Sequence, residues 1–164
     1  YIESIREHFD YILIDCSPSL GMLTLNALSA ADSVLIPVQA EYLPVKGLQQ
    51  LLETIIRVKW RLNSKLEVEG ILMAMTNSRT VYGREFASFL RRNYGSKVTV
   101  FKSDIPRSVR ASEASSLGIS IFEHAPNSRV AEAYQSLVNE ILSQSTDTSR
   151  VYRFLEGQEV RAHG

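Results

Sequence analysis

The first residue that could do chemistry is an aspartate placed directly after an apolar run. Asp15 follows residues 11–14, which are apolar without interruption. Such a run is typical of a strand buried on both faces of a parallel sheet. Open parallel sheets bind ligands beyond the carboxyl ends of their strands. A carboxylate there can hold a magnesium ion beside a nucleotide's phosphates, or it can cap a turn. The local pattern leaves both interpretations open.

Basic side chains gather along one predicted helix further down the chain. Arg84, Arg91 and, less well aligned, Arg92 share a polar face, and Lys97 and Arg110 lie nearby in sequence. A solvated helix face is the ordinary interpretation of such charges, and contact with nucleic-acid phosphates is the alternative. Lys and Arg total 18, as do Asp and Glu. Any nucleic-acid surface must therefore come from local clustering and not from net charge.

Strands and helices alternate along the elements that would position these residues. Buried-strand patterns occur at residues 11–14, 33–38, 69–75 and 98–101. Helical patterns occur at residues 22–31, 45–62, 82–94, 107–117 and 130–141. This alternation predicts an α/β fold with a mostly parallel sheet and helices on both faces. Gly118 occupies the position favoured after a helix end, and Asn127 or Ser128 can cap the last helix.

The composition is that of one globular domain followed by a tail. Residues 1–143 suit a single domain with a sizeable core, and residues 144–164 form a polar C-terminal tail. The single cysteine, Cys16, rules out an internal disulfide and is expected to be a buried small hydrophobe. No apolar run approaches the roughly 20 residues that span a bilayer. The mixed apolar and basic residues 151–155 are too few to anchor the chain, so no stable membrane association is expected.

Several segments, in order, resemble one family. Residues 11–28 closely resemble the second nucleotide-binding motif of the ParA-type partitioning ATPases, which are P-loop ATPases with a deviant Walker A sequence. The resemblance continues through residues 36–39. It is sharpest at residues 105–114, which look like the family's adenine-side loop and the helix after it. It covers the chain from about Phe9 to Leu142, and several motifs in order are more specific than any one alone.

The resemblance implies roles for individual residues. Asp15 would be the catalytic, magnesium-side carboxylate of the switch loop. Asn77, Pro106 and Arg107 would line the adenine pocket, although Asn77 can equally be a turn residue and Pro106 also a rigid loop corner. Among the basic residues, Arg110 is the best individual candidate for DNA contact.

The resemblance also implies a biochemical setting. It points to ATP and Mg²⁺ as cofactors, an ATP-dependent homodimer, and binding to DNA without sequence preference. A ParB-type partner would stimulate hydrolysis, and the protein would be cytoplasmic and nucleoid-associated. The hydrolytic step would be in-line attack of water on the γ-phosphate.

One family motif is missing from the sequence. The glycine-rich loop with two lysines, which cradles the phosphates, should precede Tyr1, and residues 1–10 contain no glycine and no lysine. The chain is therefore expected to be the C-terminal part of a P-loop NTPase-like domain without the P-loop strand, unable to hydrolyse ATP or bind it tightly. In this fold the missing strand neighbours the one ending at Asp15, so an unpaired edge and self-association are expected.

Three alternatives remain at this point. Two of them, a MinD-like membrane ATPase and a cobyrinate amide synthase, belong to the same superfamily but have a different function. The third is of a different functional class: a non-enzymatic remnant that binds DNA or a partner without ATP. Residues 107–114 favour a ParA-type protein over all three.

Overall fold

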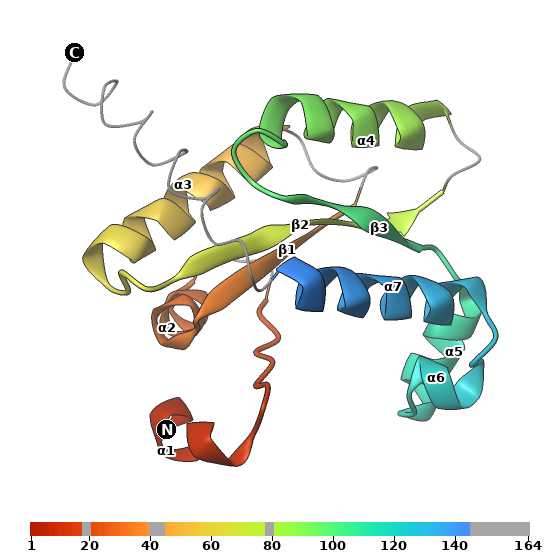
Figure 1. Cartoon of the computed structure of the whole chain (residues 1–164), viewed down its shortest axis with the longest axis horizontal. Helices are drawn as coiled ribbons and strands as arrows, with labels where there is room; N and C mark the ends of the chain where they lie inside the picture. The colour runs from red at the N-terminus through yellow and green to blue at the C-terminus, as the bar shows by residue number, and fades with distance from the viewer. Residues whose placement is uncertain (18–20, 40–44, 78–80, 145–164) are drawn as a thin grey trace. The chain divides into compact units, whose positions relative to one another are not determined.

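The computed structural model describes residues 1–17, 21–39, 45–77 and 81–144 (Figure 1). Two compact units divide the chain: Tyr1–Val34 with Val45–Glu67, and Leu35–Pro44 with Val68–Gly164. The elements are, in chain order, α1 (Ile2–Ile5), the 3-10 helix η1 (Arg6–His8), α2 (Met22–Ala30), β1 (Ser33–Gln39), α3 (Val45–Arg61), β2 (Glu67–Thr76), α4 (Val81–Tyr94), β3 (Val100–Pro106), α5 (Val109–Leu117), α6 (Ile121–His124) and α7 (Arg129–Gln144).

A three-stranded parallel sheet forms the centre of the second unit. Its strand order is β1-β2-β3, and β2 and β3 are parallel neighbours. Helices α4 and α7 both pack on β3, and Figure 1 shows them on opposite sides of the sheet. The prediction of an α/β fold with helices on both faces is confirmed.

The core of this unit lies between the sheet and α7. Leu72 of β2 and Phe101 and Ile105 of β3 pack with Val130 and Leu137 of α7, and Phe101 is fully buried. Burying each such side chain contributes about 1.5 to 3 kcal/mol. These contacts hold β2 and β3 against α7 as far as Ile105, close to the carboxyl end of β3.

Strand β3 carries an irregularity that a carboxylate stabilises. Ile71 pairs with Val100 but Met73 pairs with Asp104, so β3 has extra residues between them. Glu140 of α7 accepts hydrogen bonds there from the backbone N–H groups of Lys102 and Ser103, at 2.8 and 3.0 Å. Burial alone would raise the pKa of Glu140, but these bonds and the Ser103 hydroxyl outweigh it, so the pKa lies below its ordinary value.

The end of β3 differs from the expectation at residues 98–101. The strand runs over Val100–Pro106 because its pairing with β2 continues as far as Pro106 opposite Thr76. Helix α5 then ends at Leu117, and Gly118 follows it as predicted, with a left-handed φ of 66°. Ser128, one of the two predicted caps, accepts a hydrogen bond from Ala131 N–H at the start of α7.

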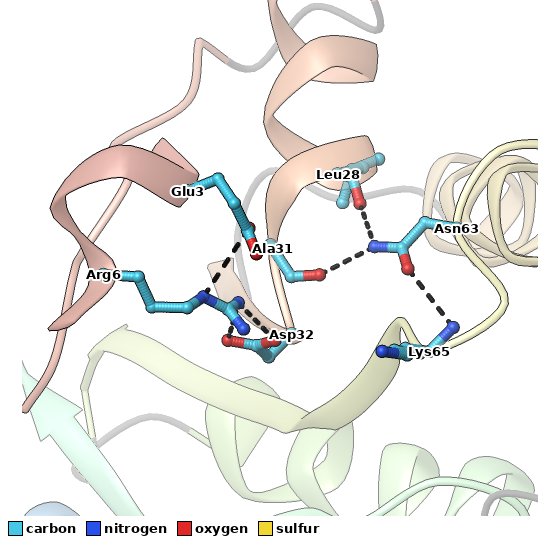
Figure 2. Close-up of polar contacts among 7 residues, drawn as sticks. All are labelled: Glu3, Arg6, Leu28, Ala31, Asp32, Asn63 and Lys65. Atoms are coloured by element: carbon cyan, nitrogen blue, oxygen red, sulfur yellow. Dashed lines mark hydrogen bonds and ion pairs between the residues drawn. The ribbon is translucent and has the colours of Figure 1, made fainter. Parts of the chain in front are cut away.

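The first unit contains α2 and α3, which pack on each other. Asn63, just beyond α3, donates hydrogen bonds to the carbonyls of Leu28 and Ala31, at 3.1 and 2.7 Å, and so satisfies the C-terminal end of α2 (Figure 2). Its own side-chain oxygen accepts from Lys65 N–H at 3.2 Å. One asparagine therefore fixes the end of α2 against the turn after α3.

The buried strand predicted at residues 11–14 does not form. Residues 11–17 are in no strand, and Tyr11 and Leu13 are 69% and 93% exposed. A strand needs a hydrogen-bonding neighbour, and the described strands β1, β2 and β3 pair only with one another.

Candidate functional site

The carboxyl ends of β2 and β3 are joined by hydrogen bonds centred on Thr76. Its hydroxyl donates to Asp104 Oδ2 at 2.5 Å and lies 3.5 Å from the carbonyl oxygen of Ile105. Its own carbonyl accepts from Arg107 N–H at 3.1 Å. Thr76 is only 9% exposed, whereas the Asp104 side chain is exposed. The buried Thr76 hydroxyl thus links the two strand ends, and the Asp104 carboxylate lies at the surface.

A backbone feature sets this strand end. Met75 has a φ of 51°, in the left-handed region that non-glycine residues rarely adopt. The register also shifts between Ala74 and Thr76. At this strand end Met75 is 52% exposed, while the next residue, Thr76, is buried. Such backbone strain persists only where surrounding contacts fix it, and it clusters at ligand-binding sites.

The predicted adenine-side residues lie together at this edge. Asn77 directly follows Thr76, and Pro106 is the register partner of Thr76. Arg107 is exposed and is held through its backbone N–H. The structure therefore brings Asn77, Pro106 and Arg107 to one edge of the sheet. Their contact with adenine stays a prediction.

Asp15 belongs to the first unit, where it lies exposed directly after residues 11–14. A single carboxylate is a ligand that Mg²⁺ accepts when phosphate oxygens complete its shell. Among the described residues, no group of three or more His, Cys, Asp or Glu could hold a metal ion. Asp15 could therefore hold Mg²⁺ only together with the oxygens of a bound phosphate. The prediction that Cys16 is buried is wrong, because it shares this exposed segment.

The elements on either side of Asp15 are anchored within the first unit. Arg6 of η1 donates two hydrogen bonds to the carboxylate of Asp32, at 2.6 and 2.7 Å, and also lies 4.0 Å from Glu3 (Figure 2). The hydrogen bond and the charge of Asp32 raise the pKa of Arg6. The N-terminal helices are thereby tied to the start of β1, while Asn63 holds the end of α2.

Comparison with known proteins identifies the family. Residues 1–68 match the AAA domain family. The chain is 46% identical over 140 residues to the sporulation initiation inhibitor protein Soj of Bacillus subtilis, covering 85% of this chain and 54% of that relative. It is 44% identical over 148 residues to the chromosome partitioning protein ParA of Myxococcus xanthus, covering 90% and 52%. The chain belongs to the ParA/Soj family of chromosome-partitioning ATPases.

A solved structure shows the same fold. Cobyrinic acid a,c-diamide synthase from Mycobacterium smegmatis is 30% identical, with a TM-score of 0.72 over 91% of this chain and 53% of that one. Structures of that enzyme hold ADP or an ATP analogue with magnesium. This ParA/Soj chain spans about half the length of the curated relatives it matches.

The basic residues of this ParA/Soj chain that were predicted to contact DNA fall into two groups. Helix α4 packs on β3 and leads from the end of β2 to the start of β3, so it runs against the strands. The exposed Arg91, Arg92 and Lys97 therefore lie at the amino end of β3, and the exposed Arg110 lies beyond its carboxyl end. The length of β3, roughly 20 Å, separates the two groups. The side chain of Arg84 lies outside the described residues.

Sequence reasoning missed the pair of Thr76 and Asp104. The available signal was two polar residues beyond predicted strands, Thr76 directly after residues 69–75 and Asp104 shortly after residues 98–101. Only the register, which brings the two side chains together, shows that they form a unit.

A shallow cavity of about 410 Å³ lies elsewhere, on α5 and α6. Glu113 and His124 line it and pair with each other at 3.1 Å between Oε2 and Nε2. It includes none of the predicted site residues. Among the described residues, no helix is long and apolar enough to cross a membrane.

Proposed function

We propose that this chain carries the nucleoside side of the nucleotide site of a ParA-type partitioning ATPase, together with part of its DNA-contacting surface. The observation that carries the proposal is the assembly of Asn77, Pro106 and Arg107 at the carboxyl ends of β2 and β3. Ligands of parallel sheets bind beyond such ends. The 44% identity to the chromosome-partitioning ATPase Soj of Thermus thermophilus supports ATP as the nucleotide.

The phosphate side of the site depends on residues outside this sequence. Bound Mg²⁺ and a glycine- and lysine-rich loop would neutralise the charge that develops on the γ-phosphate. In the whole protein, Asp15 would hold the magnesium side of the phosphates. ATP-dependent dimerisation, stimulation by a ParB-type partner and a nucleoid location belong to that whole protein. This chain alone neither hydrolyses ATP nor binds it tightly.

For DNA contact, the group at the carboxyl end of β3 is the better candidate. Arg110 is exposed and lies on the first turn of α5, close in sequence to the nucleotide-side residues Pro106 and Arg107. A cation at this position can respond to a bound nucleotide. Arg91, Arg92 and Lys97, at the other end of β3, would extend contact along a DNA backbone.

Retention of this chain on double-stranded DNA across a salt series tests this surface. Arg110→Glu is expected to weaken retention strongly and to lower the slope against log salt concentration by about 1 or more. Arg92→Glu, an equal charge reversal on α4, serves as the control and is expected to have the smaller effect. Reversing Arg91 and Arg110 together should abolish retention. Salt-independent retention, or none at low salt, contradicts DNA contact by this chain.

A second candidate function rests on the structural comparison. The likeness to cobyrinic acid a,c-diamide synthase at a TM-score of 0.72 favours a nucleotide-dependent amide synthase. The higher identity to Soj, 46% against 30%, favours partitioning. Binding of this chain to a corrinoid but not to DNA would reverse that preference.

A further inference from the structure

The carboxylate of Asp104 has a surface position that the proposed function does not explain. Its Oδ2 accepts the Thr76 hydroxyl hydrogen bond. Among the residues that the structure describes, Asp104 makes no ion pair, and its Oδ1 accepts no hydrogen bond. An exposed carboxylate that is held in one orientation at the carboxyl ends of parallel strands can recognise a hydrogen-bond donor of a bound ligand.

The position of Asp104 relative to the nucleoside-side residues is fixed by the backbone. Thr76, which orients Asp104, is followed directly by Asn77. Its carbonyl holds Arg107 N–H, and its register partner is Pro106. Asp104 therefore lies at the edge where the proposed function places the base. The strained Met75 and the buried Thr76 limit how far this edge can move.

An ionised carboxylate can only accept hydrogen bonds, so it selects for donors and against acceptors. Adenine presents a single exocyclic amino group on its six-membered ring, whereas guanine presents two adjacent donors. One oxygen of Asp104 is already used by Thr76, which leaves one oxygen for one donor. We propose that Asp104, oriented by Thr76, selects the base of the nucleotide by accepting a hydrogen bond from the amino group of adenine.

This inference rests on the proposed function and adds a specificity-determining residue to it. It does not involve the phosphates. The selection can therefore be measured on this chain with nucleosides, although the sequence carries no phosphate loop. Purine riboside is adenosine without the amino group, and it isolates the contact.

The test is ligand-observed saturation-transfer NMR with millimolar adenosine, purine riboside and guanosine on the 164-residue chain. Adenosine is expected to bind about tenfold more tightly than purine riboside, the difference typical of a hydrogen bond to a charged group. Asp104→Ala should bring adenosine down to the level of purine riboside and leave purine riboside unchanged. Thr76→Val keeps Asp104 but removes its orientation, and it should shrink the preference.

The control is Glu123→Gln, which removes an exposed carboxylate on α6 in the same unit and should change nothing. Circular dichroism establishes that each variant is folded. If adenosine binds but purine riboside binds equally well, or if Asp104→Ala keeps the preference, this inference alone is overturned. If none of the nucleosides binds the unaltered chain, both this inference and the nucleoside-side proposal fail.

Discussion

Individual residues decide how the carboxyl ends of β2 and β3 are built. Thr76 is buried and donates to Asp104, and its carbonyl fixes Arg107. The sequence motif pointed to Asn77, Pro106 and Arg107 at this edge. It could not reveal the Thr76 and Asp104 pair, because that contact depends on a register shift near Met75 that no local pattern encodes. The sequence thus predicted Asn77, Pro106 and Arg107, but not the hydrogen-bonded pair of Thr76 and Asp104 beside them.

Glu140 gives a pH-dependent prediction at the same scale. Glu140→Gln keeps the shape but leaves a single acceptor oxygen, so only one of the backbone N–H groups of Lys102 and Ser103 keeps a hydrogen bond, and that bond is no longer charge-assisted. The loss of stability is expected to be about 1 to 2 kcal/mol at neutral pH, after allowance for partial exposure. Urea unfolding of the two proteins measures it.

The sign of the pH effect follows from the lowered pKa of Glu140. The stabilisation is fully present above the ordinary glutamate value of 4.5. It is lost as the pH falls through that value and the lower folded-state pKa, since the protonated carboxyl resembles glutamine. The difference between the two proteins should therefore shrink in acid. A difference that grows on acidification would show that the hydrogen bonds to β3 are not its source.

At the scale of elements, most of the helices and strands were predictable because their apolar spacing is strong. The buried runs at β1 and β2 and the periodic helices α3 and α4 have bounds close to those expected. The bounds of β3 were predicted less well, and the strand predicted at residues 11–14 does not form. Its composition is that of a buried strand, yet a strand forms only beside another strand, and no local pattern reports whether that neighbour exists.

The packing of β2 on β3 gives an element-scale prediction. A Cβ atom on Gly70 would lie 2.7 Å from Cε2 of Phe101 and 3.0 Å from the carbonyl oxygen of Thr99. Gly70→Ala is therefore expected to destabilise the chain by about 1 to 3 kcal/mol through overpacking. Gly118→Ala is the contrasting variant, because open space surrounds Gly118 and only its φ of 66° opposes alanine. Thermal unfolding should show the larger loss for Gly70→Ala, and equal losses would argue against close packing there.

At the scale of the whole molecule, the exposed apolar segment around Leu13 predicts self-association. Tyr11 and Leu13 are 69% and 93% exposed on residues that pair with no described strand. Apolar extended segments with unpaired backbone groups associate with one another. We expect dimers or larger species in solution.

Light scattering with size-exclusion chromatography measures this association. Leu13→Lys should shift the chain toward monomer, because a charge on an extended edge opposes pairing. Leu117→Lys on α5 is the matched control, since Leu117 is also exposed, at 63%, but lies on a helix. A monomeric unaltered chain, or equal effects of the two variants, would contradict association through residues 11–14.

The central claim is that this ParA/Soj chain contains the nucleoside side of the site without the phosphate cradle. Calorimetric titration of the chain with ATP, with and without Mg²⁺, tests it most directly. The expected result is no binding at micromolar ATP and no effect of Mg²⁺, with only weak affinity that matches adenosine. Micromolar ATP binding that depends on Mg²⁺ would contradict the claim.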